Sequence, residues 1–141
     1  MRKLFLVYYL LCSAFLFSQK SSSDIDLVLK HMKTQEDSWN EGKIESFMNY
    51  YWKSDSLKFI GKKGITYGWQ QTLDNYLKSY PDKATMGILK FSIKEATQLS
   101  AESIYIIGSW ELQKEKPVGG YFTLLWKKIE GKWVIVSDHT S

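Results

Sequence analysis

Arginine is almost absent from this chain of 141 residues, since Arg2 is its only occurrence. The planar guanidinium group of arginine is the side chain best suited to grip phosphate or guanine at two points. Positive charge comes instead from scattered lysines, adjacent only at Lys62-Lys63 and Lys127-Lys128, a pattern typical of solvated turns and strand edges. Taking Arg2 and Lys3 from the formal net charge of +4 leaves +2, which indicates no charged partner. The sequence therefore predicts that the protein does not bind nucleic acid.

Cysteine and histidine are equally scarce, with Cys12, His31 and His139 as the full set. No two of these residues have the short spacing of a metal-binding motif. The only adjacent glycine pair, Gly119-Gly120, precedes an expected strand rather than a helix, which excludes a phosphate-binding loop there. We expect neither a metal ion nor a cofactor.

The first residues have the pattern of a secretory signal peptide. A positive start at Arg2 and Lys3 is followed by an apolar run from Leu4 to Phe17 and then by a polar stretch. We place the cut at about residue 19, which leaves residues 20–141 as a single domain without a membrane anchor. Lipidation at Cys12 is not expected, because Leu11 before it is bulky and the apolar run continues after it. The predicted location is secreted or periplasmic.

Three helices are expected in the first half of the domain. Apolar residues recur at helical spacing from Ile25 to Trp39, from Ile44 to Tyr51 and from Trp69 to Tyr80. Asn40-Glu41-Gly42 separates the first two helices, and Pro81 ends the third.

Strands dominate the rest of the chain. Alternating apolar or β-branched residues predict strands over residues 57–61, 65–67, 89–93, 104–110, 121–129 and 132–137. Glu130-Gly131 supplies the glycine of a two-residue hairpin turn between the last two strands. Helices followed by a long antiparallel meander indicate an α+β fold.

Several short motifs resemble the nuclear transport factor 2-like superfamily, and more closely its SnoaL-like branch. They are SerTrpAsnGluGly at 38–42, PheMetAsnTyrTyr at 47–51, SerAspSer at 54–56, GlyTrpGlnGlnThrLeuAspAsnTyr at 68–76, GlyTyrPheThrLeuLeuTrpLys from Gly120 and GlyLysTrpValIleValSerAspHis from Gly131. The resemblance implies a cone-shaped curved sheet, mixed or antiparallel, wrapped around three N-terminal helices. It also implies an apolar pocket at one end and homodimers formed through the outer sheet face. The superfamily contains isomerases, dehydratases, hydrolases and binding modules, so the fold does not choose a function.

His139 is the leading candidate for a catalytic group, because it titrates near neutral pH and directly follows a strand. Asp55 could pair with His139 and orient its ring. The alternatives are a terminal histidine bonded to a neighbouring loop and an aspartate that accepts backbone hydrogen bonds at an element boundary. Asp138 and His139 are neighbours in the chain and point to opposite faces of a regular strand, so at most one of them faces the pocket.

Aromatic side chains could line an apolar cavity with a few polar tips, the usual composition of a small-molecule site. The alternative for several of them is ordinary core packing. The expected pocket-lining residues are Trp39, Trp52, Tyr67, Trp69, Tyr76, Tyr80, Trp110 and Thr123.

Three functions are compatible with these observations. The first is an exported domain that binds a small apolar molecule in its cone. The second is an enzyme for proton transfer or water addition, of isomerase, dehydratase or hydrolase type, with His139 as its base. The third is a homodimerisation module that uses the outer face of the sheet.

Overall fold

The computed structural model describes residues 23–141, and the expected signal peptide lies outside this range. The helices are α1 (Asp24–Asn40), α2 (Ile44–Phe47), the 3₁₀ turn η1 (Met48–Tyr50), α3 (Trp69–Ser79) and α4 (Lys83–Met86). The strands are β1 (Lys58–Gly61), β2 (Gly64–Tyr67), β3 (Ile88–Ser100), β4 (Ser103–Gln113), β5 (Val118–Ile129) and β6 (Lys132–Thr140). The predicted α+β class is confirmed.

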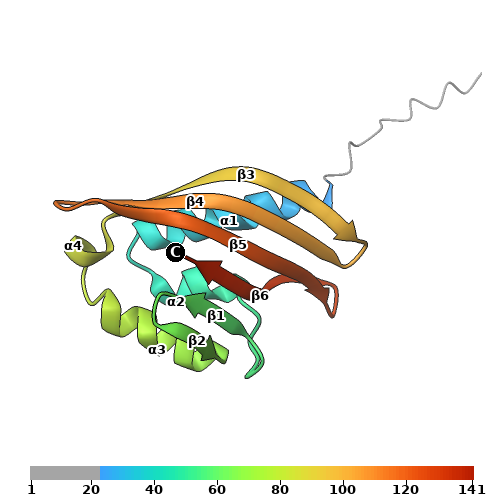
Figure 1. Ribbon diagram of the computed structural model, residues 1–141, viewed down its shortest axis with the longest axis horizontal. Coiled ribbons are helices and arrows are strands. Elements are labelled where there is room, and N and C mark those ends of the chain that lie inside the picture. Colours follow the sequence, from blue (N-terminus) through green and yellow to red (C-terminus); the bar gives the residue numbers. More distant parts are fainter. Residues whose placement is uncertain (1–22) are drawn as a thin grey trace, which may run out of the picture.

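The strands form one curved sheet in the order β2-β1-β6-β5-β4-β3. Neighbouring strands are antiparallel except for β1 and β6, which run parallel. The long strands β3, β4 and β5 arch over α1, while α3 lies below the short β1–β2 hairpin (Figure 1). A mixed, unclosed sheet therefore curves around the helices, as the resemblance to the superfamily implies.

Helix α1 packs one apolar face into the concave side of the sheet. Ser23 caps the helix, since its hydroxyl accepts from the backbone N–H of Asp26 while the Asp26 carboxylate accepts from the backbone N–H of Ser23. Val28 and Met32 are buried on the inner face, and each contributes about 1.5–3 kcal/mol by removing apolar surface from water. This helix forms one wall of the space inside the cone.

The edge strand β3 is fastened to α1 by side chains that replace a missing neighbouring strand. The Asn40 amide accepts from the backbone N–H of Leu89 at 2.7 Å and donates to the carbonyl of Leu89 at 3.0 Å. The Glu36 carboxylate accepts from the backbone N–H of Phe91 at 2.7 Å. These bonds occupy backbone groups that an edge strand otherwise leaves free.

Several element bounds differ from the expected ones, since β4, β5 and β6 are longer and the second helix ends in the 3₁₀ turn η1, and two differences are larger. Helix α4 was not expected because four residues are too short to show an apolar period; its start is capped by the Asp82 side chain, which accepts from the backbone N–H of Thr85 at 2.8 Å. Strand β3 continues to Ser100, well beyond the expected end at Ile93. Its second half is largely exposed on both faces, so it lacks the alternation of apolar and polar residues that predicts a strand.

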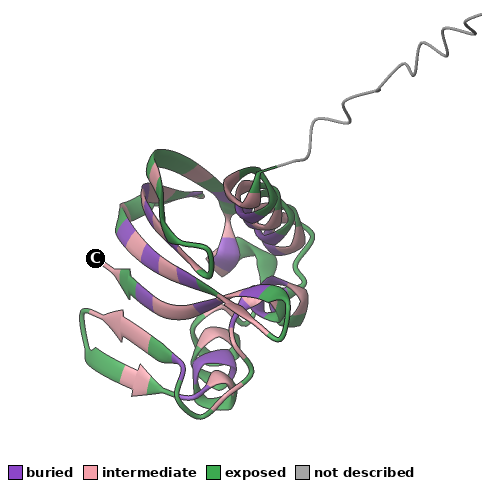
Figure 2. Ribbon diagram, turned by 90° about the vertical axis from the view of Figure 1, so that its right-hand side faces the viewer, coloured by how far each residue is buried: buried purple, intermediate pink, exposed green. Residues whose placement is uncertain are grey.

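The closing hairpin has the expected two-residue turn, in which Glu130 has φ 50° and Gly131 has φ 76°. A β-bulge then interrupts the ladder between β5 and β6. Leu125 pairs with Ser137 while Trp126 pairs with Ile135, so Val136 has no partner of its own. An extra residue in one strand reverses the alternation of side chains beyond it. Alternating buried and half-buried residues on the long strands are visible in Figure 2.

Candidate functional site

The space between the concave sheet face and the helices is a cavity of about 710 Å³. That volume lies within the range of small-molecule sites. Most of its wall is apolar or aromatic. The residues of this part of the wall are Trp39, Phe47, Tyr51, Phe59, Tyr76, Tyr80, Leu89, Phe91, Trp110, Leu112, Val118, Phe122, Leu124 and Ile135.

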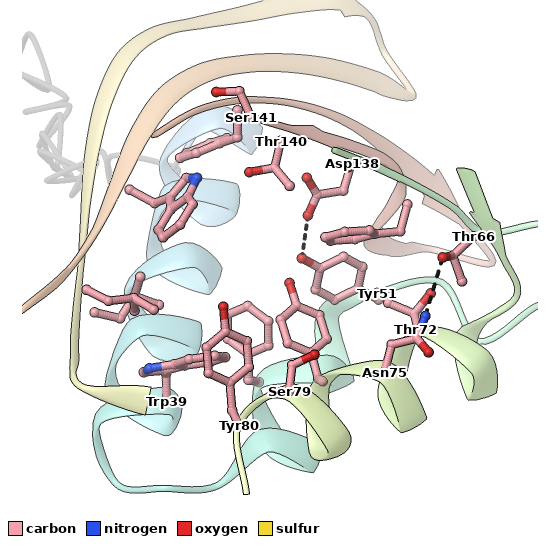
Figure 3. A pocket seen from close by; sticks show the side chains of 18 of the residues that line it. Trp39, Tyr51, Thr66, Thr72, Asn75, Ser79, Tyr80, Asp138, Thr140 and Ser141 are labelled. Carbon is pink, nitrogen blue, oxygen red and sulfur yellow. Dashed lines mark hydrogen bonds between the residues drawn. The ribbon is translucent and has the colours of Figure 1, made fainter. Parts of the chain in front are cut away.

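A buried carboxyl group lies in this wall. Asp138 on β6 is only 5% exposed, and its Oδ2 accepts a hydrogen bond of 2.6 Å from the Tyr51 hydroxyl (Figure 3). The two residues meet because the backbone of Tyr51 forms a parallel bridge with Ile135 on β6, and the N–H of Trp52 donates to the carbonyl of Ile135. Tyr51 thus holds the carboxyl group in one orientation.

Burial dominates the electrostatics of Asp138. Desolvation disfavours the ionised carboxylate and raises the pKa of Asp138 to about 7, although the hydrogen bond from Tyr51 acts in the opposite direction. Burial, together with the charge of Asp138, holds the pKa of Tyr51 and Tyr76 well above the usual range. Near neutral pH the cavity therefore contains a carboxyl group that is present in both protonation states, beside hydroxyl groups that stay protonated.

Two buried polar side-chain atoms of residues in the cavity wall have no hydrogen-bond partner among the described residues. One is Oδ1 of Asp138 and the other is Nε1 of Trp110. A buried polar group without a partner costs about 1–3 kcal/mol, so such groups usually meet a water molecule or a ligand. The wall thus includes an indole donor and a carboxyl oxygen whose hydrogen-bonding capacity is not met by the described chain.

The structure brings four of the eight expected pocket residues to the cavity wall: Trp39, Tyr76, Tyr80 and Trp110. The other four, Trp52, Tyr67, Trp69 and Thr123, are not part of the wall.

Tyr67 lies on the outer strand β2 and is 58% exposed. The Trp69 indole donates to the carbonyl of Met48 at 2.9 Å and so ties α3 to η1. Thr123 pairs with His139 on the face of the sheet opposite the cavity.

His139, the leading catalytic candidate from the sequence, has an exposed side chain that lies outside the cavity wall. The bulge at Val136 is the reason: with regular alternation His139 would share the inner face with Ile135, and the extra residue turns Asp138 inward instead. Asp55 is exposed in the turn before β1 and forms no hydrogen bond with His139. The expected pair of His139 and Asp55 is therefore not assembled.

Sequence reasoning missed Tyr51 and set Asp138 aside. The sequence shows the tyrosine pair Tyr50-Tyr51 at the end of the second expected helix, but nothing in its spacing links it to residue 138. His31 on α1 is half-buried and stacks on Tyr50 with ring centroids 4.6 Å apart. Burial, followed by the charge of Lys30, lowers the pKa of His31.

A curved mixed sheet that closes over helices and encloses an aromatic cavity defines a cone-shaped α+β fold. A solved structure of a nuclear transport factor 2-like protein of unknown function from Shewanella oneidensis shares this fold with a TM-score of 0.79. It is 40% identical, over 82% of this chain and 97% of the other. The chain belongs to the nuclear transport factor 2-like superfamily. Membership of the SnoaL-like branch stays a prediction.

More distant structures share the fold alone. A ketosteroid isomerase-like protein from Erwinia carotovora is 17% identical over 84% of this chain and 95% of its own, with a TM-score of 0.66. A superfamily protein from Salmonella enterica is 16% identical over 83% and 89% of the two chains, with a TM-score of 0.65. No family model matches the chain, and no curated protein does.

Proposed function

We propose that this protein binds a small, mainly apolar molecule that carries a hydrogen-bonding group. The observation that carries the proposal is a cavity rich in aromatic and aliphatic side chains, whose wall includes two residues with unpartnered buried polar atoms, Asp138 Oδ1 and Trp110 Nε1. Apolar walls supply affinity by removing ligand surface from water. Isolated polar groups in such walls supply orientation.

The test uses a neutral probe and variants that fill the cavity. Binding of N-phenyl-1-naphthylamine to the purified protein is measured by isothermal titration calorimetry. Leu124→Trp adds an indole at a buried position of the wall and should abolish binding. Leu99→Trp makes the same exchange at a residue that is 58% exposed and outside the wall, so it should bind like the wild type.

Ser79→Trp provides a second way to fill the cavity, since Ser79 is exposed but lines the wall. It keeps the test informative if Leu124→Trp does not fold, which circular dichroism reveals. Unchanged probe binding in Ser79→Trp and in folded Leu124→Trp would refute the proposed site.

A second candidate function is proton transfer within the cavity, with Asp138 in the role that the sequence suggested for His139. A pKa of about 7 lets a carboxyl group act as base or acid at neutral pH. Its Oδ1 has no hydrogen-bond partner in the described chain, and the Tyr51 hydroxyl fixes the other oxygen. The likeness to a ketosteroid isomerase-like structure is compatible with a reaction that moves a proton between two carbons.

This candidate is tested with 3-cyclohexenone, whose isomerisation to the conjugated ketone is followed by ultraviolet absorbance. The wild type should accelerate the reaction and Asp138→Asn should not, because the amide cannot take the proton. His139→Asn should leave the rate unchanged, since His139 lies outside the cavity wall. A wild-type rate equal to that of Asp138→Asn would remove this candidate.

Export and dimerisation complete the proposal. The positive start and apolar run at residues 1–19 support export, and fractionation of the producing cells tests it.

Ile107, Leu125 and Val134 are half-buried side chains on the outer sheet face, which supports a homodimer through that face. Light scattering of the purified protein measures its mass. None of the helices between residues 23 and 141 has the length and apolar character that a membrane crossing needs.

A further inference from the structure

Three lysines line the cavity near its opening. Lys62 and Lys63 form the turn between β1 and β2, and Lys78 lies in the last turn of α3. All three side chains are exposed, and none of them forms a hydrogen bond or an ion pair with another described residue. The cavity thus has a positively charged rim, defined here by these three residues.

Among the other described lysines, Lys33, Lys43 and Lys128 form ion pairs with acidic side chains, and the rest form none. Lys33 pairs with Asp37 at 2.7 Å, and Lys43 pairs with Glu41 at 2.6 Å. Among the side chains that line the cavity, Asp138 is the single carboxyl group, and it is buried on β6 rather than exposed at the rim. No acidic side chain of the wall therefore neutralises the three lysines.

Contacts between the β1–β2 hairpin and α3 keep the two parts of the rim together. The Asn75 amide of α3 donates to the Thr66 hydroxyl of β2 at 3.4 Å (Figure 3). The ring of Phe59 on β1 meets the ring of Tyr76 on α3 edge-on, with centroids 5.7 Å apart. The rim lysines therefore sit on connected elements rather than on independently moving segments.

An exposed lysine in a turn is most often only solvated. Here the turn borders an aromatic cavity, and a lysine can lay its methylene stem along apolar surface while its ammonium group stays in water. The ammonium group then attracts the anionic end of a ligand whose apolar part lies in the cavity. Lysine provides a point charge rather than the two-point grip of arginine, so it sets no demand on the geometry of the anion.

We propose that the ligand is an apolar acid whose compact anionic group rests at Lys62, Lys63 and Lys78 while its apolar body fills the cavity. This inference rests on the proposed ligand-binding function and adds the chemical class of the ligand. Carboxylate, sulfonate and phosphate groups share the required chemistry. A free inorganic anion lacks the apolar body and does not bind tightly.

The experiment compares two probes with the same aromatic skeleton. 1-Anilinonaphthalene-8-sulfonate carries the anion, and N-phenyl-1-naphthylamine lacks it. The triple variant Lys62→Gln, Lys63→Gln, Lys78→Gln should weaken binding of the sulfonate about tenfold, since each exposed charge pair contributes modestly. Binding of the neutral probe should stay within about twofold, because the wall of the cavity is intact. Salt should weaken only the sulfonate complex.

A matched control separates a local effect from the change in net charge. The variant Lys30→Gln, Lys127→Gln, Lys132→Gln removes the same charge at residues that are exposed and outside the cavity wall. It should bind both probes like the wild type. Decanoate should displace the sulfonate more strongly than decanol, and inorganic phosphate should not displace it.

The outcomes distinguish this inference from the proposed function. If the neutral probe binds but the rim variant binds the sulfonate as tightly as the wild type, the apolar-acid inference is wrong and the cavity proposal stands. If neither probe binds the wild type, the proposed function itself fails. Displacement by phosphate as effective as that by decanoate would also overturn the inference, because the rim would then recognise a free anion.

Discussion

Replacing Asp138 by asparagine should remove most of the pH dependence of stability between pH 5 and pH 8. The pKa of Asp138 is raised from 3.8 to about 7 by burial. Between these values the unfolded chain loses the proton while the folded protein keeps it, so the free energy of unfolding falls as pH rises. The loss of stability begins near the pKa of Asp138 in the unfolded chain and is complete above its pKa in the folded protein.

The size of the effect follows from the shift. A difference of about three pKa units corresponds to about 4 kcal/mol in total, and about 3 kcal/mol of it falls between pH 5 and pH 8. Asparagine is neutral throughout, keeps the shape of the side chain and still offers an oxygen to the Tyr51 hydroxyl. The variant should therefore be more stable than the wild type at pH 8, with a smaller advantage at pH 5.

Urea unfolding at several pH values measures the effect by linear extrapolation. His31 acts with the opposite sign, because its lowered pKa makes stability rise with pH in the window below its unfolded value. Both proteins contain His31, so its contribution cancels in the difference between them. Asp55→Asn, at an exposed aspartate, is the control for the loss of one carboxyl group. Parallel profiles for Asp138→Asn and the wild type would refute the reasoning about burial.

Three further substitutions test local features. Tyr51→Phe removes the 2.6 Å hydrogen bond to Asp138, so it should raise the pKa of Asp138 further, seen by carbon-13 NMR titration, and cost about 1–3 kcal/mol. Gly108→Ala places a Cβ 2.5 Å from Phe122 Cζ and should lower stability by about 1–3 kcal/mol in thermal unfolding. Glu130→Asn should raise stability by about 0.5–1 kcal/mol, because Glu130 has φ 50° in a turn that favours asparagine.

Each of these expectations can fail in a recognisable way. An unchanged carboxyl titration in Tyr51→Phe would mean that the hydrogen bond does not influence the ionisation of Asp138. A Gly108→Ala variant as stable as the wild type would show that Phe122 can move aside without cost. A loss of stability in Glu130→Asn would contradict the left-handed turn conformation.

Local features of the fold were readable from neighbouring residues. The helical spacing from Ile25 to Trp39, the stop at Pro81 and the glycine at Gly131 each act over a few positions, so the sequence predicts the corresponding elements. Elements without a local pattern were missed or shortened. Helix α4 is a single capped turn, and the second half of β3 has no buried face to produce alternation.

The identity of the group that faces the cavity depended on long-range geometry. Because side chains alternate along a strand, the sequence predicts that at most one of Asp138 and His139 faces inward. The bulge at Val136 turns Asp138 inward and His139 outward. The pKa of Asp138 depends on burial by elements distant in the chain, and its partner Tyr51 lies 87 positions away.

Amino-acid order alone thus establishes helices α1 and α3, the closing hairpin, the scarcity of metal ligands and the abundance of aromatic residues. The inward turn of Asp138, its bond to Tyr51 and the placement of Lys62 and Lys78 around one cavity arise only when the chain folds. Local patterns record backbone preferences over a few residues, whereas a site is made by residues far apart in the chain that packing brings together.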